Sequence, residues 1–96
     1  MKYLVVFKAL SNPYRLKILV ALSEKPQTIT DLSKTLKISP PLVSIHLRKL
    51  LRAGLVKEGE KETIDRKPNP PLNKSYYEIT DFNFQVNPRV LKEVNL

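Results

Sequence analysis

Cysteine is absent from this 96-residue sequence. Its absence excludes disulfide bonds, thiolate metal ligands and thiol nucleophiles together. Long apolar runs are missing as well, because none is longer than Ile18 to Leu22, far short of the roughly 18 residues that a membrane-spanning helix needs. The N-terminal residues carry no signal-peptide pattern. We therefore expect a cytoplasmic protein.

Acidic side chains are scarce in the first part of the chain. Residues 1–57 hold eleven basic and two acidic side chains, a net charge of +9, whereas residues 58–96 hold six basic and seven acidic ones, a net charge of −1. A basic body of this size predicts a polyanionic partner. Nucleic acid and an anionic membrane surface both fit this charge, and composition alone does not choose between them.

The spacing of apolar residues predicts a mainly α-helical chain with one β-hairpin. Apolar periodicity, prolines at first helical positions and capping side chains predict helices over residues 2–10, 13–23, 31–37, 40–53 and 88–95. Leu55–Glu58 and Tyr76–Thr80 have a period of two and are predicted to be paired strands. Residues 63–74 contain three prolines and are predicted to form a long hairpin tip.

Several local signals give more detailed expectations. Thr30 is the expected cap of the third helix, and Gly54 is the expected left-handed residue that ends the fourth. The helix over 13–23 has a wide apolar stripe and is expected to be central and largely buried. The fourth helix is expected to bury Val43, Leu47, Leu50 and Leu51. Residues 2–10 also fit a strand because three of them favour extended backbone, and helix is the preferred interpretation.

The helices over 13–23, 31–37 and 40–53, of which the last two form a helix-turn-helix, are followed by a hairpin. This order predicts a winged helix-turn-helix, an α+β fold that is mainly α with a β-hairpin wing. Two separated segments also resemble a known family. Residues 9–19 (ALSNPYRLKIL) resemble the first-helix signature of ArsR-type regulators, and residues 38–56 (ISPPLVSIHLRKLLRAGLV) resemble their recognition helix and the start of their wing. The resemblance covers about residues 7–80 and implies a dimeric, DNA-binding transcriptional regulator.

The outward face of the fourth helix suits a DNA groove by its own chemistry. If the apolar stripe is buried, the opposite face and its edge carry Pro41, Ser44, Ile45, Arg48, Lys49 and Arg52. Serine can bond a base edge or a phosphate, arginine can fork onto guanine, and isoleucine can contact a thymine methyl. Pro40 and Pro41 lack the amide hydrogens with which many helices hold a phosphate, and Ile45 stands where the family that this segment resembles often has a polar or basic residue. We therefore expect apolar, A·T-leaning base readout, with affinity from phosphate contacts. A solvated charged face is the alternative for this helix taken alone.

Other basic residues lie outside this helix. The expected wing tip carries Arg66, Lys67 and Lys74, which suit the DNA backbone or the minor groove; a disordered loop is the alternative. Lys2, Lys8, Arg15 and Lys17 are expected to be ordinary surface residues rather than phosphate contacts. The single histidine, His46, is expected to be partly buried and hydrogen bonded rather than catalytic.

Dimerisation is expected from the resemblance, since ArsR-type dimers pair their first and last helices. The corresponding apolar seam here consists of Tyr3, Leu4, Phe7, Val90, Leu91 and Val94. Residues 1–10 and 88–96 are thus the expected dimerisation helices of one domain spanning residues 1–96.

Metal chemistry is not expected. Metal-sensing relatives use cysteine pairs before the recognition helix, or sets of aspartate, histidine and glutamate in the terminal helix. Residues 30–34 hold no cysteine and residues 80–96 no histidine, so we expect no metal and no cofactor. No carboxylate pair, nucleophile motif or phosphate loop indicates an enzyme.

The leading interpretation is a sequence-specific regulator, most simply a repressor. It is expected to bind double-stranded DNA as a homodimer, with the 40–52 helix in the major groove and the 63–74 wing on the backbone or in the minor groove. Two alternatives stay open. One is a winged-helix module for protein–protein interaction, and the other is a sequence-independent, chromatin-type DNA binder.

Overall fold

The computed structural model describes residues 3–64 and 72–94. Along these ranges the elements are α1 (Tyr3–Leu10), α2 (Pro13–Glu24), α3 (Ile29–Leu36), α4 (Pro40–Arg52), β1 (Val56–Ile64), β2 (Leu72–Ile79) and α5 (Pro88–Glu93). This order of elements confirms the predicted winged helix-turn-helix, and it confirms helix rather than strand for the first segment. None of the helices in the described ranges combines the length and hydropathy needed to cross a membrane.

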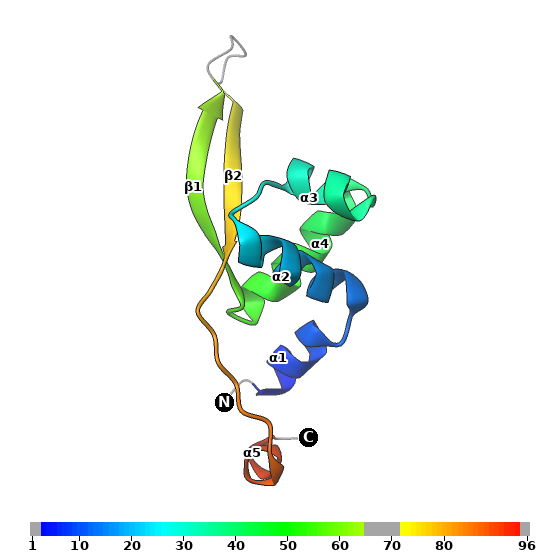
Figure 1. Cartoon of the computed structure of the whole chain (residues 1–96), viewed down its shortest axis with the longest axis vertical. Coiled ribbons are helices and arrows are strands. Elements are labelled where there is room, and N and C mark those ends of the chain that lie inside the picture. Colours follow the sequence, from blue (N-terminus) through cyan, green and yellow to red (C-terminus); the bar gives the residue numbers. More distant parts are fainter. Residues whose placement is uncertain (1–2, 65–71, 95–96) are drawn as a thin grey trace.

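The molecule is elongated, with extents of 56 × 23 × 23 Å. Helices α1 to α4 form its body, and the β1–β2 hairpin extends from one side of that body to one end (Figure 1). After β2 the chain returns past α1, and α5 lies at the end opposite the hairpin, apart from the body (Figure 1). The hairpin and the two expected dimerisation helices therefore lie at opposite ends of the molecule.

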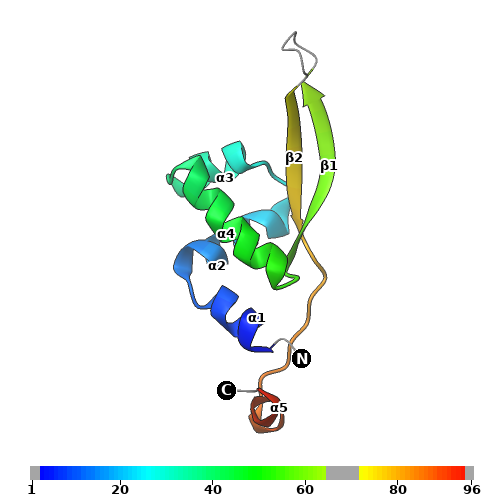
Figure 2. The same cartoon turned by 180° about the vertical axis from the view of Figure 1, so that it is seen from behind.

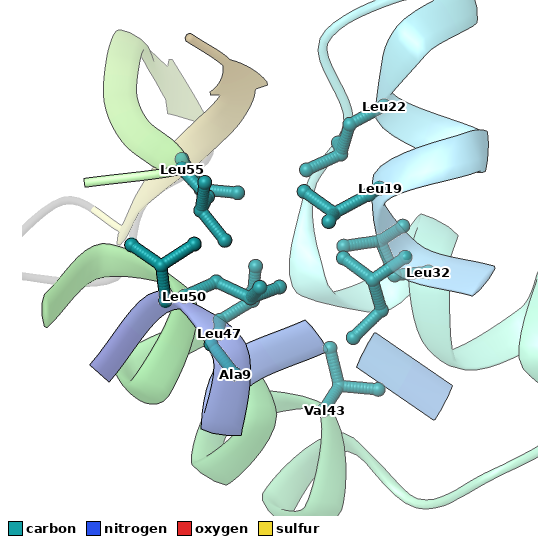
Figure 3. Packing of buried hydrophobic residues seen from close by; sticks show 11 residues of the cluster. Ala9, Leu19, Leu22, Leu32, Val43, Leu47, Leu50 and Leu55 are labelled. Atoms are coloured by element: carbon teal, nitrogen blue, oxygen red, sulfur yellow. The ribbon is translucent and has the colours of Figure 1, made fainter. Parts of the chain in front are cut away.

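The hydrophobic core lies where α4 packs against α2 and α3. Its largest fully buried side chains are Ile18, Leu32, Val43, Leu47, Leu50 and Leu55 (Figure 3). Each contributes about 1.5–3 kcal/mol through the apolar surface that it removes from water. Because Val43, Leu47 and Leu50 form one stripe of α4, the packing orients the other side of α4 toward solvent.

Two expectations about burial were wrong. Leu51 does not belong to the buried stripe of α4, since it is 36% exposed. Helix α2 is central but not largely buried, because Leu16 is exposed and Val20 is 65% exposed. Helix α2 buries Ile18, Leu19 and Leu22 instead, and Leu16 and Val20 line a groove between α2 and α3. The apolar side chains of α2 itself are distributed around the whole helix, so their spacing alone did not identify the face that packs against the core.

The cap of α3 is Thr28 and not Thr30, and the helix begins two residues earlier than predicted. The Asp31 backbone N–H donates to Thr28 Oγ1 at 3.1 Å, and the Thr28 N–H donates to Asp31 Oδ2 at 3.2 Å. This reciprocal pair is a capping box, which needs a threonine three residues before an acidic or amide side chain. Thr30 lies inside the first turn, where its hydroxyl cannot act as the cap.

The C-terminus of α4 confirms the expected role of Gly54. Its φ of +76° is left-handed, a conformation that glycine adopts without steric cost. The Gly54 N–H donates to the Leu51 carbonyl and the Leu55 N–H donates to the Leu50 carbonyl, both at 3.1 Å. This double closure is a Schellman motif. It turns the chain sharply, so that Leu55 enters the core and β1 starts at Val56.

The hairpin strands are longer than predicted. The expected tip over 63–74 was too wide, because Thr63 pairs with Asn73 and Ile64 pairs with Leu72. The outer part of the ladder consists mainly of charged and polar residues, whose composition does not distinguish a strand from a loop. Cross-strand backbone hydrogen bonds extend the ladder there. Residues 65–71 lie outside the described part of the chain.

The hairpin is fixed to the body at its base. Gln27, in the turn between α2 and α3, exchanges two backbone hydrogen bonds with Tyr77 of β2, at 3.0 and 2.8 Å. Tyr77 and Ile79 also pack against the core. These contacts set the direction in which the wing leaves the helices.

Candidate nucleic-acid interface

The helix-turn-helix consists of α3, a turn over residues 37–39 and α4. Lys37 closes α3 in a left-handed conformation with φ of +57°. The Ile38 N–H then donates to the Ser33 carbonyl at 3.3 Å, and Ser33 Oγ donates to the Ile38 carbonyl at 2.5 Å. The middle of the turn is thereby attached to α3 through both polar groups of the Ile38 backbone, which helps to fix the direction in which α4 begins. Proline at Pro40 and Pro41 starts the helix as predicted, without a side-chain cap from Ser39.

The outward face of α4 holds the residues that the sequence nominated for DNA contact. Figure 2 shows α4 on the near side of the body with α2 behind it. Five of the six nominated side chains are exposed and Ser44 is half-buried; the exposed ones are Pro41, Ile45, Arg48, Lys49 and Arg52. The structure therefore brings the six together on one accessible helix face. Contact with DNA remains a prediction for each of them.

Leu42 is a candidate contact that sequence reasoning missed. It is 48% exposed, and Ile45, three residues further along α4, is 47% exposed. Residues three apart on a helix are neighbours, so the two side chains make an apolar patch beside Arg48. The sequence indicates its exposure only indirectly, because Leu42 lies outside the buried stripe of Val43, Leu47 and Leu50. An exposed leucine alone would not stand out.

The cations of α4 have no compensating carboxylates nearby. Lys57 and Glu78 form an ion pair at 3.3 Å near the base of the hairpin. Arg48, Lys49 and Arg52 form no ion pair with the side chains that the structure describes, those of residues 3–59 and 75–94. Because no paired carboxylate neutralises them, these charges produce a positive potential along α4.

Arg15 corrects an expectation, because it is not a surface residue but 8% exposed. Its Nε donates to the Ala9 carbonyl at 2.7 Å and its Nη2 donates to the Lys8 carbonyl at 3.0 Å. Its Nη1 lies 3.3 Å from Nδ1 of His46. Arg15 thus connects the end of α1 with α4, a role that becomes visible only when the helices are packed.

His46 is partly buried and hydrogen bonded, as expected. Since Arg15 Nη1 has only hydrogens to offer, His46 Nδ1 must accept, and the neutral imidazole carries its proton on Nε2. The Tyr14 ring stacks on the imidazole with a centroid distance of 5.8 Å. Burial lowers the pKa of His46 below its ordinary value of 6.5, and the charges of Arg15 and Lys49 lower it further. The neutral form is therefore favoured beside these cations.

The wing cations are only partly placed. Lys74 lies on β2 opposite Glu62 of β1, so it belongs to the ladder rather than to the tip. Arg66 and Lys67 lie outside the described residues. DNA contact by these three residues stays a prediction.

Part of the expected dimer seam forms one cluster. Tyr3 and Phe7 of α1 stack with a centroid distance of 6.3 Å, and Tyr3 meets the ring of Phe84 edge-on at 6.5 Å. Val90, Leu91 and Val94 lie on or directly after α5, which buries none of its residues. Val90 and Val94 are half-buried and Leu91 is 51% exposed, so packing within one chain leaves much of this part of the seam accessible.

Metal ligands do not cluster in the described part of the chain. Among the described side chains, those of residues 3–59 and 75–94, no three of histidine, aspartate or glutamate lie close enough together to hold an ion. Binding without a metal remains an expectation from the sequence.

Comparison with known proteins identifies related regulators. The family model for bacterial regulatory proteins of the arsR family matches residues 12–58. The chain is 37% identical over 87 residues to an uncharacterized HTH-type transcriptional regulator, MJ0229 of Methanocaldococcus jannaschii, covering 91% of this chain and 85% of the relative.

Solved structures give the same result. HlyU from Vibrio cholerae is 31% identical with a TM-score of 0.63, and the match covers 83% of this chain and 76% of that one. The homodimeric winged helix-turn-helix DNA-binding domain of Mb0332 from Mycobacterium bovis, a possible ArsR-family regulator, is 26% identical with a TM-score of 0.64. That match covers 81% of this chain and 63% of the other.

Proposed function

Because the chain belongs to the ArsR family of bacterial regulatory proteins, we propose that it is a sequence-specific repressor that binds its operator as a homodimer. Membership in this family makes it a DNA-binding transcriptional regulator and not an enzyme. To this we add the direction of regulation, the oligomeric state and the residues that contact DNA.

The observation that carries the DNA contacts is the outward face of α4. Apolar and cationic side chains share this face, and its three cations have no ion pairs in the described ranges. In a major groove, Ser44 and Arg48 would bond base edges or phosphates, while Lys49 and Arg52 would contact phosphates. Pro41 would pack against the sugar–phosphate backbone at the start of the helix.

The exposed apolar patch supports A·T-leaning readout. Leu42 and Ile45 are exposed on α4, and with this helix in a major groove they would contact thymine methyl groups. Pro40 and Pro41 remove two of the amides with which a helix N-terminus holds a phosphate. Affinity would then come mainly from side-chain cations, with Arg66, Lys67 and Lys74 of the wing adding backbone or minor-groove contacts.

A homodimer would cover the apolar surface at the end opposite the hairpin. Phe84, Val86 and Leu91 are all exposed there, beside the expected seam of Tyr3, Leu4, Phe7, Val90, Leu91 and Val94. Helix α5 has no packing partner among the described elements, apart from the extended segment that carries it (Figure 1). The similar domain of Mb0332 is homodimeric, which supports a dimer here.

Repression is the simplest regulatory outcome of the proposed dimer. Two copies of α4 about one DNA turn apart (roughly 34 Å) would read a pseudo-palindrome from one face of the duplex. A dimer on such a site, with two wings reaching outward, would occlude promoter DNA. Activation would require in addition a surface for a partner protein.

Arg48→Ala tests the DNA contacts. Binding is measured on a duplex enriched by site selection and on a scrambled duplex of the same length and composition. The variant should lose about 1–3 kcal/mol, or roughly 5- to 150-fold, on the selected duplex and much less on the scrambled one. Lys25→Ala, at an exposed cation that follows α2 rather than α4, is the control and should bind both duplexes like the wild type.

Other results would overturn parts of the proposal. Equal losses on both duplexes would assign Arg48 to a phosphate. A wild-type protein that does not distinguish the duplexes would be a sequence-independent binder, and one that binds neither would favour a protein–protein module. Light scattering that shows a monomer at micromolar concentration would refute the homodimer, and increased transcription from the bound promoter would refute repression.

A further inference from the structure

A small cleft of about 230 Å³ lies between α1 and α4, beside the start of α2. Its lining residues are Val5, Lys8, Ala9, Arg15, Lys49 and Arg52. Four of these six side chains are cationic and none is acidic. The cations come from three different helices, so the fold and not a local run of sequence brings them together. Figure 2 shows α1 below the C-terminal half of α4, on the same side of the molecule as the outward face of α4.

The positive charges of this cleft are not neutralised within the described part of the chain. Lys8, Lys49 and Arg52 are exposed, and none forms an ion pair with the described side chains of residues 3–59 and 75–94. Like charges that converge repel one another, and a bound anion removes that repulsion. The cleft is therefore electrostatically prepared for a negatively charged group.

Arg15 adds fixed donors to the cleft. Its guanidinium has five N–H groups, of which three are used by the carbonyls of Ala9 and Lys8 and by His46. One N–H on each Nη nitrogen has no partner among the described residues. Because the three bonds already hold the side chain in place, little rotamer entropy is lost when the remaining N–H groups bind an anion.

The size of the cleft limits the ligand. Sites for small molecules typically measure about 300–1,000 Å³, and this cleft is smaller. It therefore fits one phosphate group better than a whole nucleotide or cofactor. Lysine and arginine side chains bind a phosphate through charge-assisted hydrogen bonds, and both line this cleft.

We propose that the cleft between α1 and α4 binds one phosphate of the DNA backbone. The inference rests on the proposed function, since Lys49 and Arg52 lie on α4 directly beside Arg48 and one turn beyond it. It extends the interface from the recognition helix to α1 and makes Lys8 a DNA contact rather than an ordinary surface lysine. Contact with a backbone phosphate contributes affinity on every sequence equally.

Lys8→Gln is the main test, because it removes the charge and keeps the backbone carbonyl that Arg15 bonds. Binding to the selected and the scrambled duplex is measured by fluorescence anisotropy over a series of salt concentrations. Loss of one phosphate contact should weaken binding to both duplexes by the same factor and reduce the steepness of log K against log salt by about 0.9. Arg52→Gln, on the opposite wall of the cleft, should have the same effect.

Lys25→Gln is the matched control and should leave the salt slope unchanged. Lys8→Gln with the slope of the wild type would overturn the inference whatever Arg52→Gln does, because the proposed function alone already places Arg52 on a phosphate. The proposed function would still stand if Arg48→Ala lost its preference for the selected duplex in the same series. A wild-type protein that binds neither duplex would instead refute the proposed function itself, and the phosphate assignment with it.

Titration with inorganic phosphate separates a DNA phosphate from a free one. Amide shifts of Lys8 and Ala9 are followed by NMR in the protein without DNA. If free phosphate shifts these amides in the wild type, and Lys8→Gln abolishes the shifts while its salt slope on DNA stays unchanged, the cleft binds a free phosphate and the DNA assignment is wrong. A reduced salt slope, with or without these shifts, supports the DNA phosphate.

Discussion

Replacing Arg15 by methionine should lower the free energy of unfolding by about 2–4 kcal/mol. The substitution keeps the length of the apolar stem and removes three hydrogen bonds. The Ala9 carbonyl then loses its donor at 2.7 Å, and no helical bond can replace it because Pro13, four residues later, has no N–H. His46 Nδ1 also loses its donor. The Lys8 carbonyl keeps Ser11 Oγ at 2.7 Å.

The magnitude follows from these losses. Two buried acceptors without partners cost about 1–3 kcal/mol each. Part of this cost is offset because a buried guanidinium no longer has to be removed from water. A net loss of about 2–4 kcal/mol remains. With a urea m-value of about 1–3 kcal/mol/M, the midpoint of unfolding should fall by roughly 1–3 M.

Urea unfolding followed by circular dichroism measures this change, at one fixed protein concentration because a dimer's stability depends on it. Lys17→Met is the control, an exposed cation on the same helix whose Nζ lies 5.7 Å from the centroid of the Tyr14 ring. It should change stability by less than about 1 kcal/mol. If Arg15→Met unfolds at the same urea concentration as this control, the guanidinium does not hold α1 to α4 and the reasoning is wrong.

Three further predictions concern other positions. The pKa of His46 is lowered in the folded protein, so the unfolded state binds the proton more tightly. The free energy of unfolding of the wild type should therefore fall as pH decreases below about 6.5. In urea melts His46→Asn, which keeps an acceptor near the position of Nδ1, should lose less stability over the same pH range. Thr28→Ala should lose about 1 kcal/mol of stability as a lost cap, and Thr30→Ala clearly less; equal losses would contradict the capping box. Gly54→Ala should lose about 1 kcal/mol from its left-handed φ alone, since nothing lies within 4 Å of an added Cβ; an unchanged melting midpoint would disprove this strain.

The elements whose signals are local were predictable. Pro13, Pro40 and Pro88 each start a helix, because proline's fixed φ and missing N–H suit only the first turn. Gly54 ends α4 because only glycine adopts that φ without strain. The outward face of α4 followed from the same helical geometry. All of these depend on interactions within a few residues, which the sequence displays directly.

Features that depend on packing were not predictable. Arg15 has no unusual neighbours in the sequence, and its burial appears only when α1, α2 and α4 meet. Leu16 and Val20 look like core residues, yet α2 packs through Ile18, Leu19 and Leu22. The long hairpin depends on cross-strand hydrogen bonds between segments whose composition is typical of a loop.

The sequence by itself therefore determined which segments are helical, where they begin and end to within about two residues, and which side of α4 is polar. These follow from backbone sterics and from periodicity, both of which act locally. The tertiary structure alone decided which apolar face of α2 is buried, that Arg15 joins α1 to α4, and that four cations from three helices line one cleft. Burial and charge convergence are properties of distances between segments far apart in the chain, and only the packed fold specifies those distances.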